Sequence, residues 1–113
     1  MCLRVTSTVT IVSKELTCSE KLKVLSDRTR LAVMEYLMEE PSHVGTLVNA
    51  LGVEQSLLSH HLKVLREAEL VIGDRDGKAV LYSVAPAART ESGKAINLGC
   101  CQLVFDPGQH VRK

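Results

Sequence analysis

The fold of this chain is decided by residues 44–68, which read VGTLVNALGVEQSLLSHHLKVLREA. Apolar residues recur at helical spacing on both sides of Gly52, which predicts a short helix over about 44–51 and a longer one over about 54–68. Gly52 is expected to adopt the left-handed conformation that ends a helix. Two helices joined by a turn that contains a glycine form a helix-turn-helix. The buried face of the longer helix is expected to comprise Leu57, Leu58, Leu62 and Leu65, with His61 at its edge.

Two further helices are expected upstream of this pair. Helical spacing indicates a first helix from about 14 to 25, with Leu22 and Leu25 on the same side. A second helix is expected to begin after Asp27, whose side chain suits an N-cap, and to end before Pro41. The helix-turn-helix is therefore expected to contain the third and fourth helices of the chain.

A β-hairpin is expected downstream. Residues 70–72 and 80–84 are rich in β-prone side chains, and the Asp76-Gly77 pair between them is a strong turn signal. The fold class is thus mainly α with a small β-hairpin, a dimeric winged helix-turn-helix. The expected organisation is an N-terminal arm (1–13), a winged helix-turn-helix DNA-binding domain (14–85) and a C-terminal tail (86–113).

Composition limits the class of protein. With 113 residues and 45% hydrophobic content, the chain supports one small domain, which gains stability by pairing with a second copy. No stretch suits a signal peptide or a membrane span, so we expect a cytoplasmic protein without a membrane partner. In that reducing compartment, the four cysteines are expected to be free thiols, metal ligands or redox sensors rather than structural disulfides.

The fourth helix carries the expected DNA-reading surface. Opposite its apolar side lie hydrogen-bonding side chains that suit base edges and phosphates, and the hairpin adds two cations. The expected DNA-binding residues are Gln55, Ser56, Ser59, His60, Lys63, Arg75 and Lys78. Residues 54–78 hold four Lys or Arg against five Asp or Glu. The affinity for DNA would therefore come from a few cations at suitable positions, which a dimer presents twice. A solvated polar face without DNA is the plain alternative.

His60 and His61 invite a metal interpretation, which helix geometry disfavours. Neighbouring residues on a helix point about 100° apart and do not share one ion. His60 is therefore interpreted as a residue of the DNA-reading surface and His61 as a packed core histidine.

The stretch from Leu22 to Val84 resembles the ArsR/SmtB family of metal- and stress-responsive repressors. The residues that carry the resemblance are LSDRTRL (25–31), SHHLKVLREA (59–68), Leu70-Val71, RDGK (75–78) and LYS (81–83). The resemblance implies a homodimer that reads DNA with its fourth helix and leaves DNA when an inducer binds. Two recognition helices about 34 Å apart in such a dimer would require an inverted-repeat operator.

Two sensing motifs of this family are missing here. Arsenic-sensing relatives often carry Cys-Val-Cys-Asp-Leu in the third helix, where residues 43–47 read HVGTL. Other relatives end in a dimerising helix with paired Asp and His ligands for zinc. Residues 96–105, INLGCCQLVF, are expected to be extended and do not offer those ligands.

Cys100 and Cys101 remain as the expected sensor. Neighbouring thiols suit a soft ion, and the tail resembles the C-terminal sites of some atypical arsenic-responsive members. Side chains in an extended segment alternate between faces, so a joint site needs a local turn, which Gly99 allows. Arsenite and antimonite prefer three thiolates, and the third would come from Cys18 or Cys2 of either subunit. Cys18 also suits a small core position.

The leading functional hypothesis is a repressor whose inducer is As(III) or Sb(III), without an organic cofactor. Thiol oxidation or persulfide formation is the first alternative. A Zn or Cd sensor is the next, and a sulfur-only site would then need a fourth thiolate. A winged-helix protein-interaction module is the rival that does not bind DNA. An enzyme is not expected, because no nucleophile triad, phosphate loop or paired-carboxylate motif is present.

Overall fold

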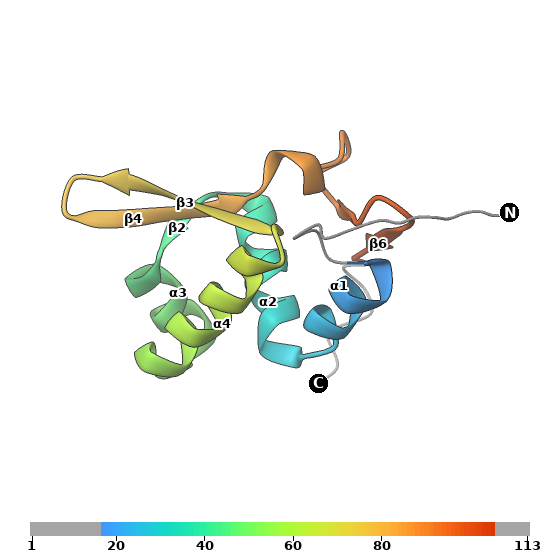
Figure 1. Cartoon of the computed structure of the whole chain (residues 1–113). Coiled ribbons are helices and arrows are strands. Elements are labelled where there is room, and N and C mark those ends of the chain that lie inside the picture. The colour runs from blue at the N-terminus through green and yellow to red at the C-terminus, as the bar shows by residue number, and fades with distance from the viewer. Residues whose placement is uncertain (1–16, 106–113) are drawn as a thin grey trace, which may run out of the picture.

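Four α-helices and two small antiparallel sheets form residues 17–105, the part of the chain that the computed structural model describes (Figure 1). The helices are α1 (Cys18–Leu25), α2 (Arg28–Glu39), α3 (Val44–Leu51) and α4 (Gln55–Glu67), with a short 3-10 helix η2 (Pro86–Ala88). The strands are β2 (Ser42–His43), β3 (Val71–Asp76), β4 (Ala79–Val84), β5 (Ala95–Asn97) and β6 (Gln102–Val104). The order of helices, helix-turn-helix and hairpin is that of a winged helix, as predicted.

The first two helices begin at capping side chains. Thr17 and Glu20 form a reciprocal capping box at the start of α1, in which the Glu20 N–H donates to Thr17 Oγ1 at 3.2 Å. Asp27 Oδ1 accepts from the Arg30 N–H at 3.0 Å and caps α2, as predicted. The expected start of the first helix near residue 14 lies outside the described residues.

The helix-turn-helix confirms the expected role of Gly52. This residue has φ 67°, and its N–H donates to the Val48 carbonyl at 2.9 Å. Leu58, Leu62 and Leu65 of α4 are buried in the core, as predicted. The expected burial of Leu57 is wrong, because 47% of this side chain is exposed. It precedes Leu58 by about 100° of helix rotation and so turns away from the core.

The wing is a three-stranded sheet in the order β2-β4-β3. Strands β3 and β4 pair from Val71↔Val84 to Asp76↔Ala79, and Gly77 at φ 67° lies in the turn between them. The hairpin was predicted, although its strands are longer than expected. The two-residue strand β2 was not predicted, because two residues are too short to show a periodic pattern.

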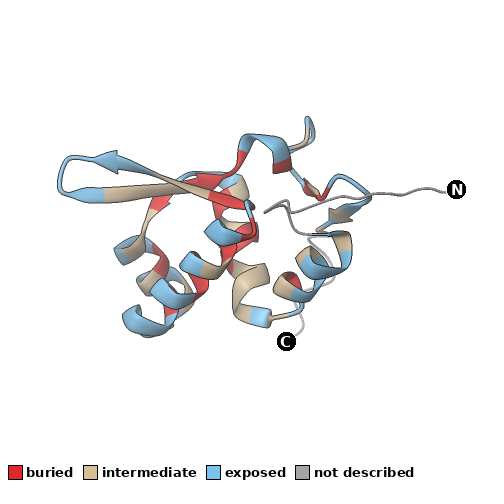
Figure 2. Ribbon diagram, in the orientation of Figure 1, coloured by how far each residue is buried: buried red, intermediate tan, exposed pale blue. Residues whose placement is uncertain are grey.

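The C-terminal segment packs against the same core. Ile96 and Leu98 are buried, and they belong to one hydrophobic cluster with residues of α1, α2, α3 and α4 (Figure 2). The segment is extended, as predicted, and β5 pairs with β6 beside α1 (Figure 1). Among residues 17–105, no helix has the length and apolar character needed to cross a bilayer.

Candidate thiol cluster and nucleic-acid interface

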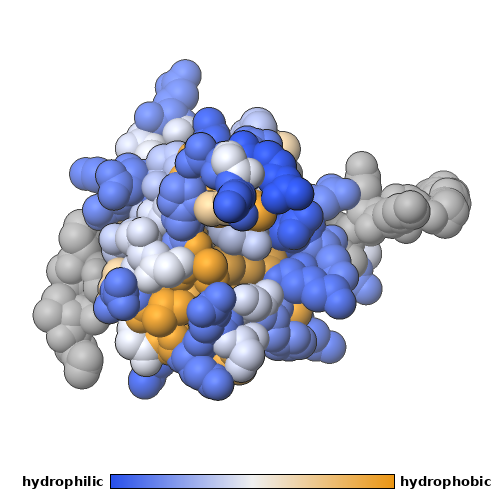
Figure 3. Space-filling view, turned by 90° about the vertical axis from the view of Figure 1, so that its left-hand side faces the viewer, coloured by the Kyte–Doolittle hydropathy of each residue, from blue (hydrophilic) through white to orange (hydrophobic). Residues whose placement is uncertain are grey.

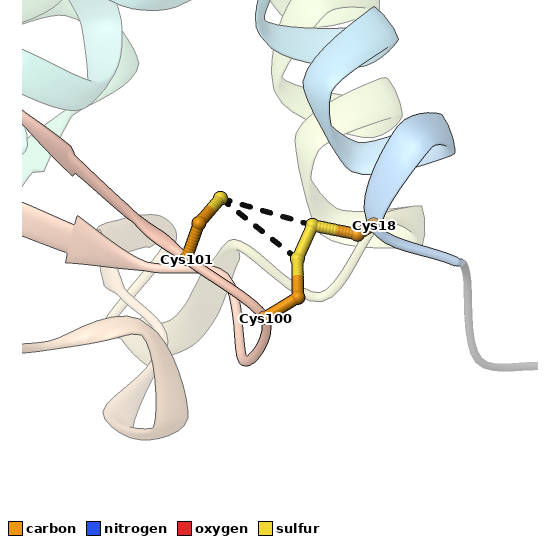
Figure 4. A group of neighbouring side chains, drawn as sticks. All are labelled: Cys18, Cys100 and Cys101. Carbon is orange, nitrogen blue, oxygen red and sulfur yellow. Dashed lines mark hydrogen bonds between the residues drawn. A yellow bond between two sulfur atoms is a disulfide. The ribbon is translucent and has the colours of Figure 1, made fainter.

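Three cysteines distant in sequence lie together between α1 and the β5–β6 turn (Figure 4). The Sγ atoms of Cys18, Cys100 and Cys101 all lie within 4.8 Å of one another. Cys18 is half-buried, and the other two are exposed. The structure thus brings together the three residues that the sequence indicated as metal ligands. Cys2, the other candidate, lies outside the described residues.

The β5–β6 turn directs both neighbouring cysteines toward α1. The Leu98 N–H donates to the Cys101 carbonyl at 2.9 Å, which closes a tight turn. Gly99 has φ +94°, a conformation that favours glycine, and its N–H donates to Asn97 Oδ1 at 2.9 Å. This is the local turn that a joint site of Cys100 and Cys101 needs.

Cys18 has a fixed place because it is the first residue of α1. The capping box of Thr17 and Glu20 sets where this helix begins. The N-terminus of a helix favours nearby negative charge, so the position suits a thiolate. A helix end and a hairpin turn therefore hold the cluster from two sides.

One pair in the cluster is covalently joined. Cys18 and Cys100 form a disulfide with a Cα–Cα distance of 6.2 Å, which lies in the usual range. Cys101 keeps a free, exposed thiol, and its Sγ lies 3.8 Å from each of the two bonded sulfurs. Sequence analysis expected free thiols, metal ligands or redox sensors, and of these the bonded pair fits the redox sensor but not a free thiol. The cluster can therefore hold one thiol with a disulfide, or three thiols once that bond is reduced.

The residues expected to bind DNA are all exposed on α4 and the wing. On α4 these are Gln55, Ser56, Ser59, His60 and Lys63, and on the wing they are Arg75 and Lys78. The wing extends from the end of the molecule that holds α3 and α4 (Figure 1). Hydrophilic side chains cover most of that end, with an apolar area among them (Figure 3). The arrangement leaves these polar groups accessible to a ligand.

A contact between the wing and the helix-turn-helix was missed by sequence reasoning. His43 is the N-cap residue of α3, and its Nε2 lies 2.9 Å from Asp76 Oδ2 at the end of β3. The two residues are 33 positions apart, so no local pattern could have paired them.

His61 is a buried histidine with a defined partner. Its Nδ1 accepts from Arg30 Nε at 3.0 Å, and Arg30 Nη1 donates to the Val24 carbonyl at 3.0 Å. Burial lowers the pKa of His61 below its usual value, although the nearby Asp27 carboxylate opposes this shift. The prediction of a packed core histidine is confirmed, whereas the Arg30 contact had no sequence signal. The backbone N–H of Arg30 donates to the Asp27 carboxylate and lowers the pKa of Asp27.

Comparison with known proteins agrees with the fold. Residues 27–72 match the sequence profile of the bacterial regulatory protein arsR family. The transcriptional repressor SmtB of Mycobacterium tuberculosis is 44% identical over 66 residues, which are 58% of this chain and 49% of SmtB. The chain spans about half the length of the curated relatives it matches.

Solved structures extend the comparison. The crystal structure of M. tuberculosis Rv0081 is 41% identical with a TM-score of 0.58, over 59% of this chain and 68% of that one. Mb0332 from Mycobacterium bovis, described as a homodimeric winged helix-turn-helix DNA-binding domain, is 25% identical with a TM-score of 0.57, over 59% and 62% of the two chains. These relatives are transcriptional regulators rather than enzymes. The chain belongs to the arsR family of bacterial regulatory proteins.

Proposed function

We propose that this chain is a homodimeric, DNA-binding transcriptional repressor that trivalent arsenic or antimony releases from its operator. The observation that carries the proposal is the convergence of the sulfurs of Cys18, Cys100 and Cys101 within 4.8 Å. A soft ion such as As(III) favours thiolate ligands and takes three of them in a pyramid. A DNA-reading helix and an accessible thiol cluster in one small domain suit a sensor that regulates transcription.

The exchange at the cluster balances without an oxidant. Arsenous acid, As(OH)3, meets the three thiols of the reduced cluster. Three As–O bonds break, three As–S bonds form, and the three thiol protons leave in three water molecules. The ion then holds the start of α1 and the β5–β6 turn together, which fixes the position of that helix against the tail.

The DNA-facing residues have distinct proposed roles. Gln55, Ser56, Ser59 and His60 present hydrogen-bonding groups from the first half of α4, where recognition helices meet base edges. Lys63 of α4, with Arg75 and Lys78 on the wing, would neutralise phosphates. A homodimer with its two recognition helices about 34 Å apart requires an inverted-repeat operator. The formal net charge of +1 implies only moderate salt dependence.

A thiol-redox repressor is the second candidate function, and the Cys18–Cys100 disulfide favours it. In this alternative, hydrogen peroxide oxidises the two thiols: the S–S bond forms, the O–O bond breaks, and the two thiol protons leave in two water molecules. Release of the protein from DNA then reports oxidation rather than metalloid binding. Zinc or cadmium has less support, because the cluster offers three sulfurs where a sulfur-only site needs four.

One titration separates these functions. Reduced protein is bound to fluorescently labelled DNA from its own promoter region, and arsenite is added while anisotropy is recorded. We expect release of the wild type and of the matched control Cys2→Ser, but not of the Cys100→Ser/Cys101→Ser variant. Release by hydrogen peroxide alone would replace the metalloid with a redox signal. Failure of any form to bind the DNA would favour the protein-interaction module.

A further inference from the structure

Arg30 lies between the helix that carries Cys18 and the helix that presents the DNA-facing residues. Its Nη1 donates to the carbonyl of Val24, in the last turn of α1, at 3.0 Å. Its Nε donates to Nδ1 of the buried His61, in α4, at 3.0 Å. Cys18 begins the same α1 whose last turn Arg30 contacts. One side chain of α2 therefore joins both helices.

We propose that Arg30 and His61 are positioning residues that couple the state of the thiol cluster to the placement of α4. The inference rests on the proposed function in that it takes the cluster as the sensor. Because α1 has only eight residues, a displacement at Cys18 is carried to Val24 as a movement of one rigid, hydrogen-bonded unit. The β5–β6 hairpin stays in place when Cys18 is displaced, because Ile96 and Leu98 are buried in the hydrophobic core.

The guanidinium group suits this role because its donors are held in one plane. A shift of the Val24 carbonyl therefore reorients Nε and Nη1 together, and His61 experiences the change at the same time. A lysine would present a single flexible ammonium and could not hold both acceptors in this fixed relation. Arg30 thus passes a change in the direction of its hydrogen bond at Val24 on to His61, and it also places a positive charge beside His61.

The effect on DNA follows from where His61 lies on α4. His61 is buried, and its neighbour His60 is exposed among the residues expected to bind DNA. A movement of the helix at His61 therefore displaces the outer side of the same turn. Helix shifts of about 1–2 Å are typical of switching proteins and exceed what hydrogen bonds to base edges tolerate.

The test uses the full chain and two matched pairs of variants. Arg30→Met removes both hydrogen bonds, and Arg28→Met removes an exposed arginine from the same turn as a control. His61→Leu removes the acceptor, whereas His61→Asn keeps a δ-position oxygen that can replace Nδ1. For each protein, the Kd for promoter DNA is measured with and without arsenite. Arsenite binding is measured separately through sulfur-to-arsenic charge-transfer absorption.

We expect arsenite to weaken DNA binding of the wild type by about 5- to 150-fold. Arg28→Met and His61→Asn should keep that ratio. Arg30→Met and His61→Leu should bind arsenite with unchanged stoichiometry, yet their ratio should fall to about 2 or less. A defect confined to stability would lower both DNA affinities and leave the ratio in place.

Other outcomes separate this inference from the proposed function. If Arg30→Met and His61→Leu are released as readily as the wild type, the coupling is overturned while the metalloid sensor stands. If only peroxide releases the wild type and Arg30→Met abolishes that response, the metalloid fails and the coupling stands. If neither signal changes wild-type affinity, both fail. Circular dichroism checks that each variant folds. If Arg30→Met does not fold, the comparison of His61→Leu with His61→Asn tests the coupling.

Discussion

His43 Nε2 lies 2.9 Å from Asp76 Oδ2, so the N-cap residue of α3 is in contact with the end of β3. The short pairing of β2 with β4, which joins Ser42 to Tyr82 and His43 to Leu81, also links these parts. The contact therefore limits how far the wing can tilt relative to the helix-turn-helix.

Asp76→Ala should weaken DNA binding by several-fold and change stability little. Both partners are more than one-third exposed, so solvent screens the pair and its contribution to stability is about 0–1 kcal/mol. The loss of affinity comes from a wing whose orientation is less restricted. Anisotropy titration and thermal unfolding measure the two effects, with the exposed Asp74→Ala as the matched control. Equal losses in both variants would mean that only charge matters.

His61 should make the fold less stable in mild acid. Its folded pKa is lowered below the usual value of 6.5, so the unfolded chain takes up the proton more readily. The stabilisation is complete above about pH 6.5 and is lost as the pH falls from there toward the folded pKa. Thermal unfolding between pH 8 and 5.5 should show a steeper decline for the wild type than for His61→Asn. His60→Asn, at an exposed position, should follow the wild type.

Local patterns were enough to predict most of the fold. The cap at Asp27, the glycine that ends α3 and the Asp-Gly turn each depend on neighbours in sequence, and all three occur as predicted. Leu57 and Leu22 were expected on apolar helix faces, yet 47% and 42% of these side chains are exposed. Periodicity identifies an apolar position on a helix, but it does not say whether another element covers it.

The candidate site was only partly predictable. Cys100, Cys101 and Gly99 adjoin in sequence, so their shared turn could be anticipated. The choice of Cys18 as the neighbouring sulfur depends on α1 lying beside the β5–β6 hairpin, which no spacing reveals. The contacts of Arg30 with His61 and of His43 with Asp76 also cross more than 30 residues, and long-range pairs of this kind need the folded chain.

Gly99→Ala should damage the thiol cluster specifically. At φ +94° a side chain is strained although a Cβ would meet no atom within 4 Å, so the cost is conformational, about 1–2 kcal/mol. Relief of that strain opens the turn that places Cys100 and Cys101 beside α1. Arsenite affinity, followed by absorption, should fall. Gly93→Ala, with φ +71° outside this turn, is the control and should keep the affinity of the wild type.

Lys63→Ala and His60→Ala should alter DNA binding in different ways. Loss of a phosphate contact weakens binding to every sequence and reduces the salt slope by about 1 per protomer. Loss of a base contact relaxes the preference for one base pair and leaves the salt slope unchanged. Titrations at several salt concentrations, on the operator and on a mutated operator, distinguish the two results. Identical changes in both variants would remove the distinction between these roles.

Oxidation should make the protein unable to bind arsenite. The Cys18–Cys100 disulfide consumes two of the three sulfurs and leaves Cys101 as the remaining thiol of the cluster, which is too few for a pyramidal site. The chain has four cysteines, so a thiol titration should count four in the reduced protein and, after the loss of two, two in the oxidised protein. Arsenite absorption should vanish with that change and return after reduction. The Cys100→Ser/Cys101→Ser variant leaves Cys18 without a partner sulfur in the cluster, so peroxide should leave its thiol count at the reduced value. Full arsenite binding by the oxidised wild type would show that the ion uses other ligands.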